Sequence, residues 1–104
     1  MAADRNEDTS PSAAKKSVES AGLRFAEAVT AFSAGDYGRA DSLFGAFARD
    51  FPSDSRAEDA TFLRADARAR RGDKMGAAAG ARAYIHAYPN GLRRPEAERL
   101  AEDH

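Results

Sequence analysis

Apolar side chains recur at helical spacing along most of the chain. The strongest pattern lies between residues 37 and 51, where residues three or four positions apart form one stripe: Ala40, Leu43, Phe44, Phe47 and Phe51. An earlier stretch, residues 17–34, places four apolar residues on one face: Phe25, Ala28, Val29 and Phe32. Because this spacing marks one side of an α-helix, the pattern predicts an all-α protein.

Glycine, proline and aspartate residues divide the pattern into five helical segments. Gly35 and Gly72 suit the left-handed conformation that follows a helix end, and the aspartate after each can accept the free N–H groups of the next helix. Pro52 and the segment 89–91 end two further helices. We therefore expect helices at about 17–34, 37–50, 56–71, 73–88 and 94–103.

The last three of these helices carry their own start signals and apolar faces. Ser55 and Glu58 have the spacing of a capping box, and Pro95 suits the first turn of the short fifth helix. The residues expected to face inward are Phe62, Leu63, Ala65, Ala69, Ala77, Ala81, Tyr84, Ile85, Tyr88, Ala97, Leu100 and Ala101.

The breaks recur at an interval of 37 residues. A shift of 37 carries the Gly-Asp pair at 35–36 onto 72–73 and the aromatic-Pro pair at 51–52 onto 88–89. The same shift superimposes Phe25 on Phe62 and Leu63 on Leu100. Chance coincidence of two alanine-rich hairpins would not match breakers and aromatics at one offset. The sequence therefore predicts a helical-hairpin repeat: repeat one at 17–53, repeat two at 54–90 and a terminal capping helix at 94–103.

One motif links this repeat to a known family. The pattern Gly35-Asp36-Tyr37-x-x-Ala40-x-x-x-Phe44-x-x-Phe47-x-x-x-x-Pro52 resembles the tetratricopeptide repeats, and a weaker copy runs from Gly72 to Pro89. The resemblance implies a right-handed superhelix of helix pairs. The interval is 37 rather than the usual 34, and Phe25 and Phe62 stand one place later than the family's usual Trp.

Both departures are shared by bacterial cell-envelope repeats. The segments 51–60 and 88–97 look like those of Tol-Pal accessory proteins and outer-membrane-assembly lipoproteins, and similar repeats occur in envelope-spanning anti-sigma regulators. The resemblance implies a non-enzymatic scaffold that binds a helix or extended segment of another protein. It implies a periplasmic or envelope location if the chain is a fragment of a longer exported protein, and a cytoplasmic one otherwise.

The first helices of such repeats line a concave binding face. By the resemblance, this face would include Phe25, Val29, Ser33, Asp59, Phe62, Asp66, Arg70, Glu96 and Arg99. The Lys and Asn residues with which some family members clamp a peptide carboxylate are missing, so that clamp is not expected. The repeat ends, near Leu23 and Leu100, are a second candidate surface for a partner or for self-association.

Composition and net charge argue against some classes of function. The 104 residues suffice for one small domain with a net charge of −1, which argues against bulk attraction to nucleic acid or membrane. Residues 1–16 lack large apolar side chains after Met1, and we expect a flexible leader ahead of a domain at 17–104. The first thirty residues lack a signal peptide, and no apolar run is long enough to insert in a membrane.

No residue pattern indicates catalysis, a cofactor or a metal. The chain has no Cys, and neither His86 nor His104 has a partner at metal-ligand spacing. The acidic residues at 58–59 and 102–103 are adjacent in sequence, so on a helix their side chains point in different directions and do not form a catalytic pair. The clearest charged pattern is a basic stripe of Arg64, Arg68 and Arg71. We expect these three arginines to form a solvated face. The alternative is that they bind nucleic acid, which would make the chain a nucleic-acid-binding helical domain.

Overall fold

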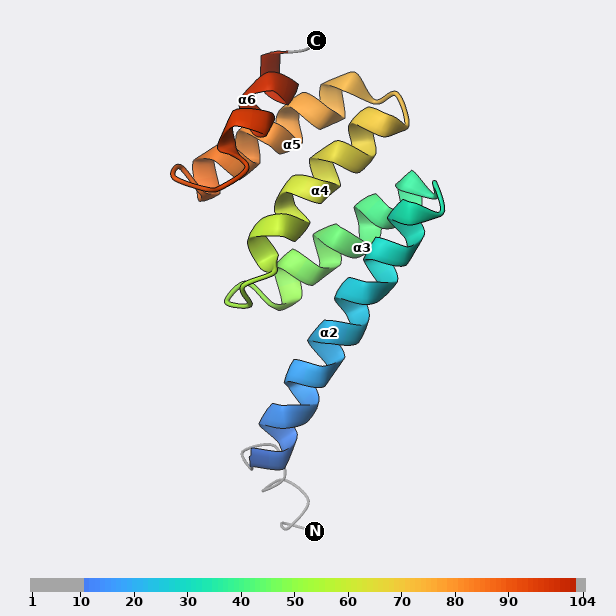
Figure 1. The fold of residues 1–104 in the computed structure, drawn as a ribbon, viewed down its shortest axis with the longest axis vertical. Coiled ribbons are helices and arrows are strands. Elements are labelled where there is room, and N and C mark those ends of the chain that lie inside the picture. Colours follow the sequence, from blue (N-terminus) through green and yellow to red (C-terminus); the bar gives the residue numbers. More distant parts are fainter. Residues whose placement is uncertain (1–10, 103–104) are drawn as a thin grey trace.

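The computed structural model describes the backbone of residues 11–102 and the side chains of residues 20–102, and this part of the chain is helical with no strand. Its helices are α2 (Pro11–Ser33), α3 (Tyr37–Asp50), α4 (Ala57–Arg70), α5 (Lys74–Ala87) and α6 (Arg94–Glu102). Each helix packs against the next, and α4 also contacts α6 (Figure 1). The predicted all-α class is confirmed.

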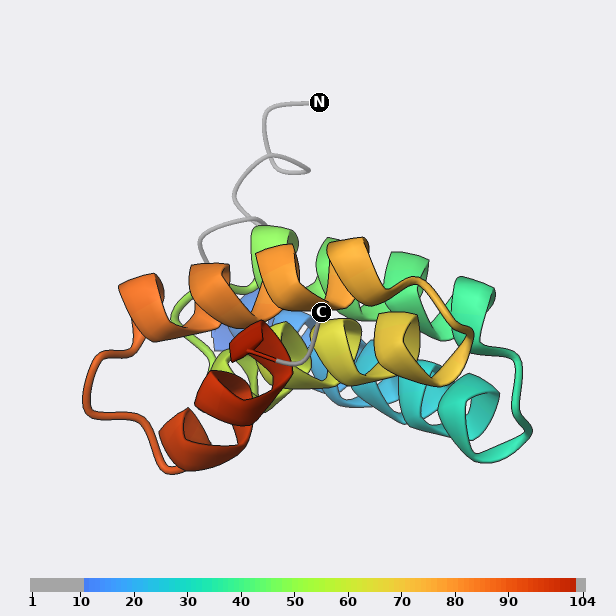
Figure 2. The same ribbon diagram turned by 90° about the horizontal axis from the view of Figure 1, so that it is seen from above.

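The helices form two layers. Viewed along the long axis, α2, α4 and α6 lie in one layer and α3 and α5 in the other (Figure 2). The N-terminal part of α2 extends beyond α3 (Figure 1). The first helices of successive hairpins therefore share one side of the molecule, which is the arrangement expected of stacked helical hairpins.

The backbone repeats with the 37-residue interval seen in the sequence. Gly35 and Gly72 have φ values of 82° and 90°. The N–H groups of Asp36 and Asp73 each donate to the carbonyl oxygen five residues earlier, at 2.9 Å in both hairpins. These are the positive φ and the hydrogen bond that close a helix C-terminus. The predicted helical-hairpin repeat is therefore present in the backbone geometry.

The two hairpins have cores of different size. In the first, Phe44 and Phe47 are fully buried, and Phe25 packs edge-on against them with ring centroids 5.8 and 5.3 Å away. In the second, alanines stand in place of Phe32 and Phe44, while Tyr84 remains buried with Phe62 5.9 Å from it. Small side chains bring α4 and α5 close together, because a Cβ added at Gly80 would lie 3.0 Å from that of Ala65.

The first helix begins earlier than predicted. It starts at Pro11, not at about residue 17. Proline suits the first turn of a helix, and the alanines and lysines that follow it favour helix continuation. The C-terminal part of the predicted leader, residues 11–16, is therefore helical, whereas residues 1–10 lie outside the described part of the chain.

Two predicted helix caps are wrong. At α4, Ser55 and Glu58 form no capping box; Asp54 accepts the N–H of Arg56 instead, at 2.8 Å, and Arg56 is the N-cap. Glu58 is instead hydrogen-bonded to α5 and the loop that follows it.

The side chain of Asp36 makes no capping bond at α3, whereas Asp73 accepts from the N–H of Gly76 at α5, at 2.9 Å. A Cβ at Gly76 would collide with the Asp73 carboxylate. The residue three positions after Asp36 is Arg39 and not glycine. Its Cβ stands where the Asp36 carboxylate would have to lie to form the same capping bond.

Candidate functional site

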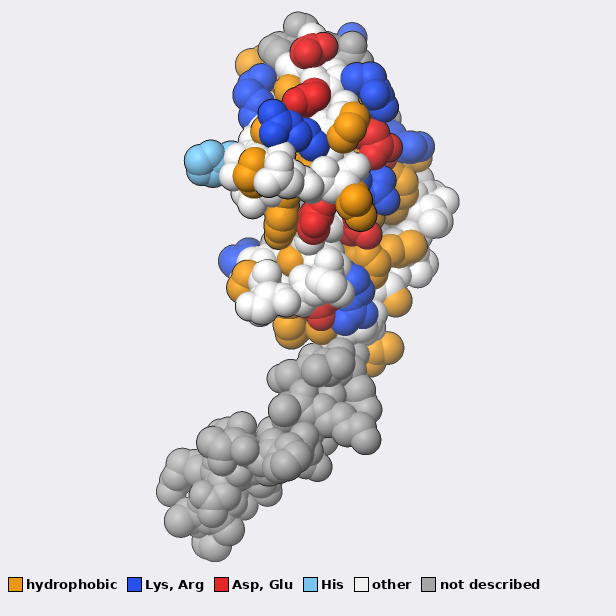
Figure 3. All heavy atoms as spheres, turned by 60° about the vertical axis from the view of Figure 1, so that its left-hand side comes forward, with side chains coloured by type: hydrophobic (Ala, Val, Ile, Leu, Met, Phe, Trp, Pro, Cys, Tyr) orange, Lys and Arg blue, Asp and Glu red, His pale blue; other side chains and the backbone are white. Residues whose placement is uncertain are grey.

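A groove of about 780 Å³ lies between α4 and α6. Phe62 and Leu100 are its apolar lining residues, and the other lining residues carry three acidic and three basic groups: Asp66, Glu96, Glu102, Arg70, Arg93 and Arg99. On the face shown in Figure 3, acidic and basic side chains are interspersed with apolar ones in the upper part of the molecule, around α5 and α6. The groove thus combines a small apolar base with charged walls of both signs.

A hydrogen-bond network around the buried Tyr84 positions α6 and the loop before it. The Tyr84 hydroxyl donates to Glu58 Oε2 at 2.7 Å, and the N–H of Leu92 donates to the same oxygen at 3.0 Å. The N–H of Arg93 donates to the Tyr84 oxygen at 3.0 Å. The chain passes so close that a Cβ at Gly91 would collide with this hydroxyl. The network fixes the loop 88–93, and with it the angle at which α6 leaves α5.

Burial and Glu58 keep Tyr84 protonated. Removal of the ring hydroxyl from water, followed by its hydrogen bond to the Glu58 carboxylate, raises the pKa of Tyr84 to about 12. A neutral phenol can donate to Glu58 while it accepts from the backbone, so both of its hydrogen-bonding roles are used. This pairing remains intact across the physiological pH range.

Arg93 forms one wall of the groove. Its Nε donates to Asp59 Oδ1 at 3.0 Å, and its Nη1 lies 3.6 Å from Glu96 Oε1. The hydrogen bond to Asp59 raises the pKa of Arg93 above its ordinary value. The guanidinium also lies over the Phe62 ring, 5.1 Å from its centroid. These contacts hold Arg93 in one place, so this wall is formed before any ligand arrives.

Arg70 is another charged residue that lines the groove. Its Nε donates to Asp66 Oδ1 at 3.2 Å, and the attraction of that carboxylate raises the pKa of Arg70. Its guanidinium lies 5.0 Å from the centroid of the Phe32 ring on α2. Arg70 therefore connects the groove to the first hairpin.

Of the concave face and the repeat ends, eight residues are the main partner-binding candidates, and the groove brings together five of them: Phe62, Asp66, Arg70, Arg99 and Leu100. Asp59 adjoins them through Arg93. Phe25 and Val29 lie on α2, away from the groove; Phe25 packs in the first core, and Val29 is 38% exposed.

At the repeat ends, Leu100 is half-buried and Leu23 is 73% exposed. Sequence reasoning missed Arg93 because it lies in a loop. The offset of 37 could have identified it, since Arg56 lies over Phe25 as Arg93 lies over Phe62.

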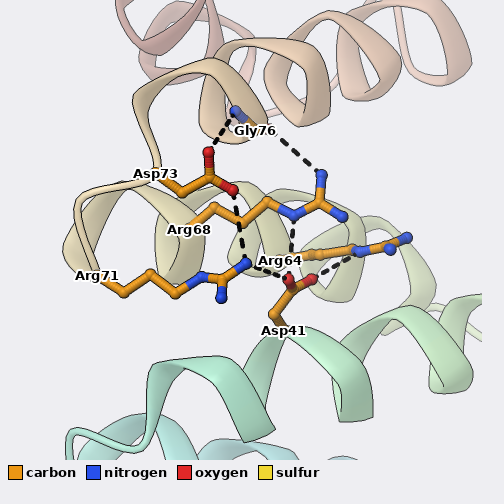
Figure 4. Close-up of polar contacts among 6 residues, drawn as sticks. All are labelled: Asp41, Arg64, Arg68, Arg71, Asp73 and Gly76. Carbon is orange, nitrogen blue, oxygen red and sulfur yellow. Dashed lines mark hydrogen bonds and ion pairs between the residues drawn. The ribbon is translucent and has the colours of Figure 1, made fainter.

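The basic stripe on α4 faces the first hairpin. Asp41 of α3 is only 8% exposed, and its carboxylate accepts from Arg64 Nε at 2.8 Å, Arg68 Nε at 3.1 Å and Arg71 Nη2 at 3.4 Å (Figure 4). Arg68 Nη1 also donates to the carbonyl oxygen of Gly76 at 3.2 Å. The stripe thus ties α3, α4 and the start of α5 together. Arg64 and Arg71 remain exposed, as a solvated face predicts, but all three arginines pair with Asp41.

One glycine on α3, Gly45, makes room for this cluster. Gly38, on the other side of Asp41, is not required for it, because a Cβ there would lie 4.0 Å from Arg71 Nη1, an ordinary contact distance. A Cβ at Gly45 would lie 3.0 Å from the Arg64 guanidinium carbon. Since the three arginines share this buried carboxylate, the arrangement favours a structural role over binding of nucleic acid.

Among residues 20–102, whose side chains the structure describes, no group of three His, Asp or Glu side chains could hold a metal ion. None of the described helices is both long and apolar enough to cross a membrane.

Comparison with known proteins adds no relative to this description. No family model matches the chain, and neither a curated protein nor a solved structure matches it. Function is therefore inferred from the geometry of the groove and from the internal repeat.

Proposed function

We propose that the chain is a non-enzymatic interaction module of tetratricopeptide-repeat type, which binds a helical or extended segment of another protein. The observation that carries this proposal is the groove between α4 and α6, with Phe62 and Leu100 at its base and charged groups of both signs along its walls. Its volume of about 780 Å³ is enough for several side chains of a bound segment.

The walls of the groove support binding because they are held in place beforehand. Arg93 is fixed by Asp59, and the loop before α6 is fixed by the pair of Tyr84 and Glu58. A site whose side chains are already ordered loses less conformational entropy when it binds. The mixed charges would then select the register and direction of the segment through complementary charges.

The wider biological setting is a proposal from the sequence resemblance. The segments after each hairpin look like those of bacterial cell-envelope scaffolds, so we propose an accessory protein of the envelope or the interaction region of an envelope-spanning anti-sigma regulator. The two-layer stacking of the hairpins agrees with such a scaffold role (Figure 2).

A displayed library of random peptides, selected on the immobilised protein, tests the proposed function. Selected peptides should lose affinity by about tenfold, roughly 1.4 kcal/mol, when Arg99→Glu reverses a wall charge or Leu100→Ala shortens the apolar base. Arg82→Glu is the matched control, because Arg82 is an exposed arginine on α5 that does not line the groove.

Circular dichroism of each variant checks that the helices remain. Peptides that bind Arg99→Glu and Leu100→Ala as well as they bind the control would place the interaction elsewhere on the surface. The groove would then have no part in recognition.

A further inference from the structure

We infer that the segment bound in the groove carries an aromatic anchor residue, whose ring enters a small pocket lined by Ala69, Lys74, Ala77 and Leu100. This pocket has a volume of about 120 Å³ and lies where α4, α5 and α6 meet. The inference rests on the proposed function, since Leu100 lines both this pocket and the groove.

The internal repeat shows what such a space holds. Subtraction of 37 from the four lining positions gives four residues of the first hairpin: Phe32, Tyr37, Ala40 and Leu63. There the space is filled by an aromatic pair, with the rings of Phe32 and Tyr37 edge-on at 5.4 Å. The Phe32 ring also meets that of Phe44 at 6.3 Å. The second hairpin keeps the aliphatic residues but lacks the two rings.

The missing rings explain the pocket. Ala69 stands in place of Phe32 and Lys74 in place of Tyr37, so the second hairpin lacks two aromatic side chains at this point. The resulting space approaches the size of an apolar cavity, about 150 Å³, that holds one benzene ring.

The charge beside the pocket also fits an aromatic occupant. The Phe32 ring that fills the equivalent space of the first hairpin has a cation beside it, since the guanidinium of Arg70 on α4 lies 5.0 Å from its centroid. At the pocket of the second hairpin, Lys74 is a lining residue and supplies a cation there. A cation near a ring face stabilises the pair, so Lys74 favours an aromatic ring over an aliphatic side chain of equal volume.

Two small probes test the pocket directly: N-acetylphenylalaninamide and N-acetylalaninamide. In a titration followed by amide chemical shifts, the phenylalanine probe should shift Ala69, Ala77 and Leu100, with an affinity at least tenfold above that of the alanine probe. Equal shifts with both probes would overturn the inference, because the pocket would then have no preference for a ring.

The variant Ala69→Phe restores the ring of the first hairpin and provides a second test. It should raise the melting temperature by about 4 to 8 °C and weaken phenylalanine-probe binding at least tenfold. Ala83→Phe, at an exposed site on the same hairpin, is the control and should do neither. If Ala69→Phe fails to fold, the comparison of the two probes on the wild type still decides.

The outcomes separate this inference from the proposed function. In one outcome, selected peptides depend on the groove yet contain no aromatic residue and bind Ala69→Phe as tightly as the wild type. That result would overturn the aromatic anchor and leave the proposed function standing. In the opposite outcome, no selected peptide depends on the groove, but the phenylalanine probe still binds selectively. That result would overturn the proposed function and leave the aromatic pocket standing. Self-association that Ala69→Phe abolishes would identify a second copy as the occupant and would overturn the assignment to another protein.

Discussion

Replacement of Asp41 by alanine removes the carboxylate shared by three arginines at the joint between the two hairpins. The substitution creates no steric conflict, because Ala78 occupies the equivalent place 37 residues later and is fully buried. Any loss of stability therefore reports on the ionic cluster and not on packing.

The expected loss follows from the geometry of the cluster. Arg64 and Arg68 donate to Asp41 at 2.8 and 3.1 Å, whereas the contact from Arg71, at 3.4 Å, is weak. A hydrogen bond between charged groups contributes about 1.5–3 kcal/mol. The arginine side chains are 45%, 21% and 44% exposed and recover hydration when the carboxylate is lost, so we discount the sum of the two good bonds by about half. Asp41→Ala should lower the free energy of unfolding by ~1.5–3 kcal/mol.

Urea unfolding followed by circular dichroism measures this difference, with Asp36→Ala as control. Asp36 is exposed and makes no capping bond, so its replacement should change stability by no more than ~0.5 kcal/mol. Arg68→Gln in a double-mutant cycle with Asp41→Ala should show coupling, since the two side chains interact directly. Equal, small effects of Asp41→Ala and Asp36→Ala would refute the structural role of the cluster and restore the stripe as a candidate binding surface.

Three further substitutions test the core and the fixed loops. Phe44→Ala should cost about 3–5 kcal/mol in urea unfolding, because Phe44 is fully buried, whereas Arg39→Ala, at an exposed ion pair, should cost no more than ~0.5 kcal/mol; similar effects at both sites would contradict the assigned core. The pKa of Tyr84 is about 12 when folded and ordinarily 10.0, so the stability contributed by its neutral hydroxyl is complete below pH 10 and is lost as the pH rises toward 12. Tyr84→Phe should therefore flatten the alkaline part of the plot of unfolding free energy against pH. An unchanged alkaline loss in this variant would contradict the raised pKa. Hydrogen bonds from Arg56 lower the pKa of Asp54 from 3.8 to about 2, so its contribution is present above pH 4 and is lost as the pH falls toward 2; Asp54→Asn should flatten the acid limb, and an acid limb as steep as the wild type's would count against the pairing.

Much of the fold follows from local sequence signals. The helix ends at Gly35 and Gly72 were predictable because the chain takes a left-handed conformation after a helix end, which residues other than glycine rarely adopt. Both glycines have positive φ. The offset of 37 then placed the first helices in one layer, which is why residues of α4 and α6 could be predicted to share a face. These inferences depend on backbone preferences and periodicity, which a sequence displays directly.

The cluster and the groove walls depend on alignment between helices and were not predictable in the same way. Arg64, Arg68 and Arg71 form a stripe in the sequence, but their pairing with Asp41 requires the antiparallel register of α3 and α4. The wrong capping box has a similar origin: Glu58 has the right spacing from Ser55, yet it interacts with Tyr84, 26 residues away. Competition from such distant partners cannot be read from spacing alone.

The location of a bound segment is most directly measured by an amide chemical-shift map of the labelled protein with a peptide from the library selection. Binding in the groove should shift residues of α4 and α6 most strongly, above all Phe62, Asp66, Arg99 and Leu100, and leave the N-terminal part of α2 unchanged. Shifts confined to the surface around Leu23, or to the cluster around Asp41, would contradict the proposal that the groove between α4 and α6 is the binding site.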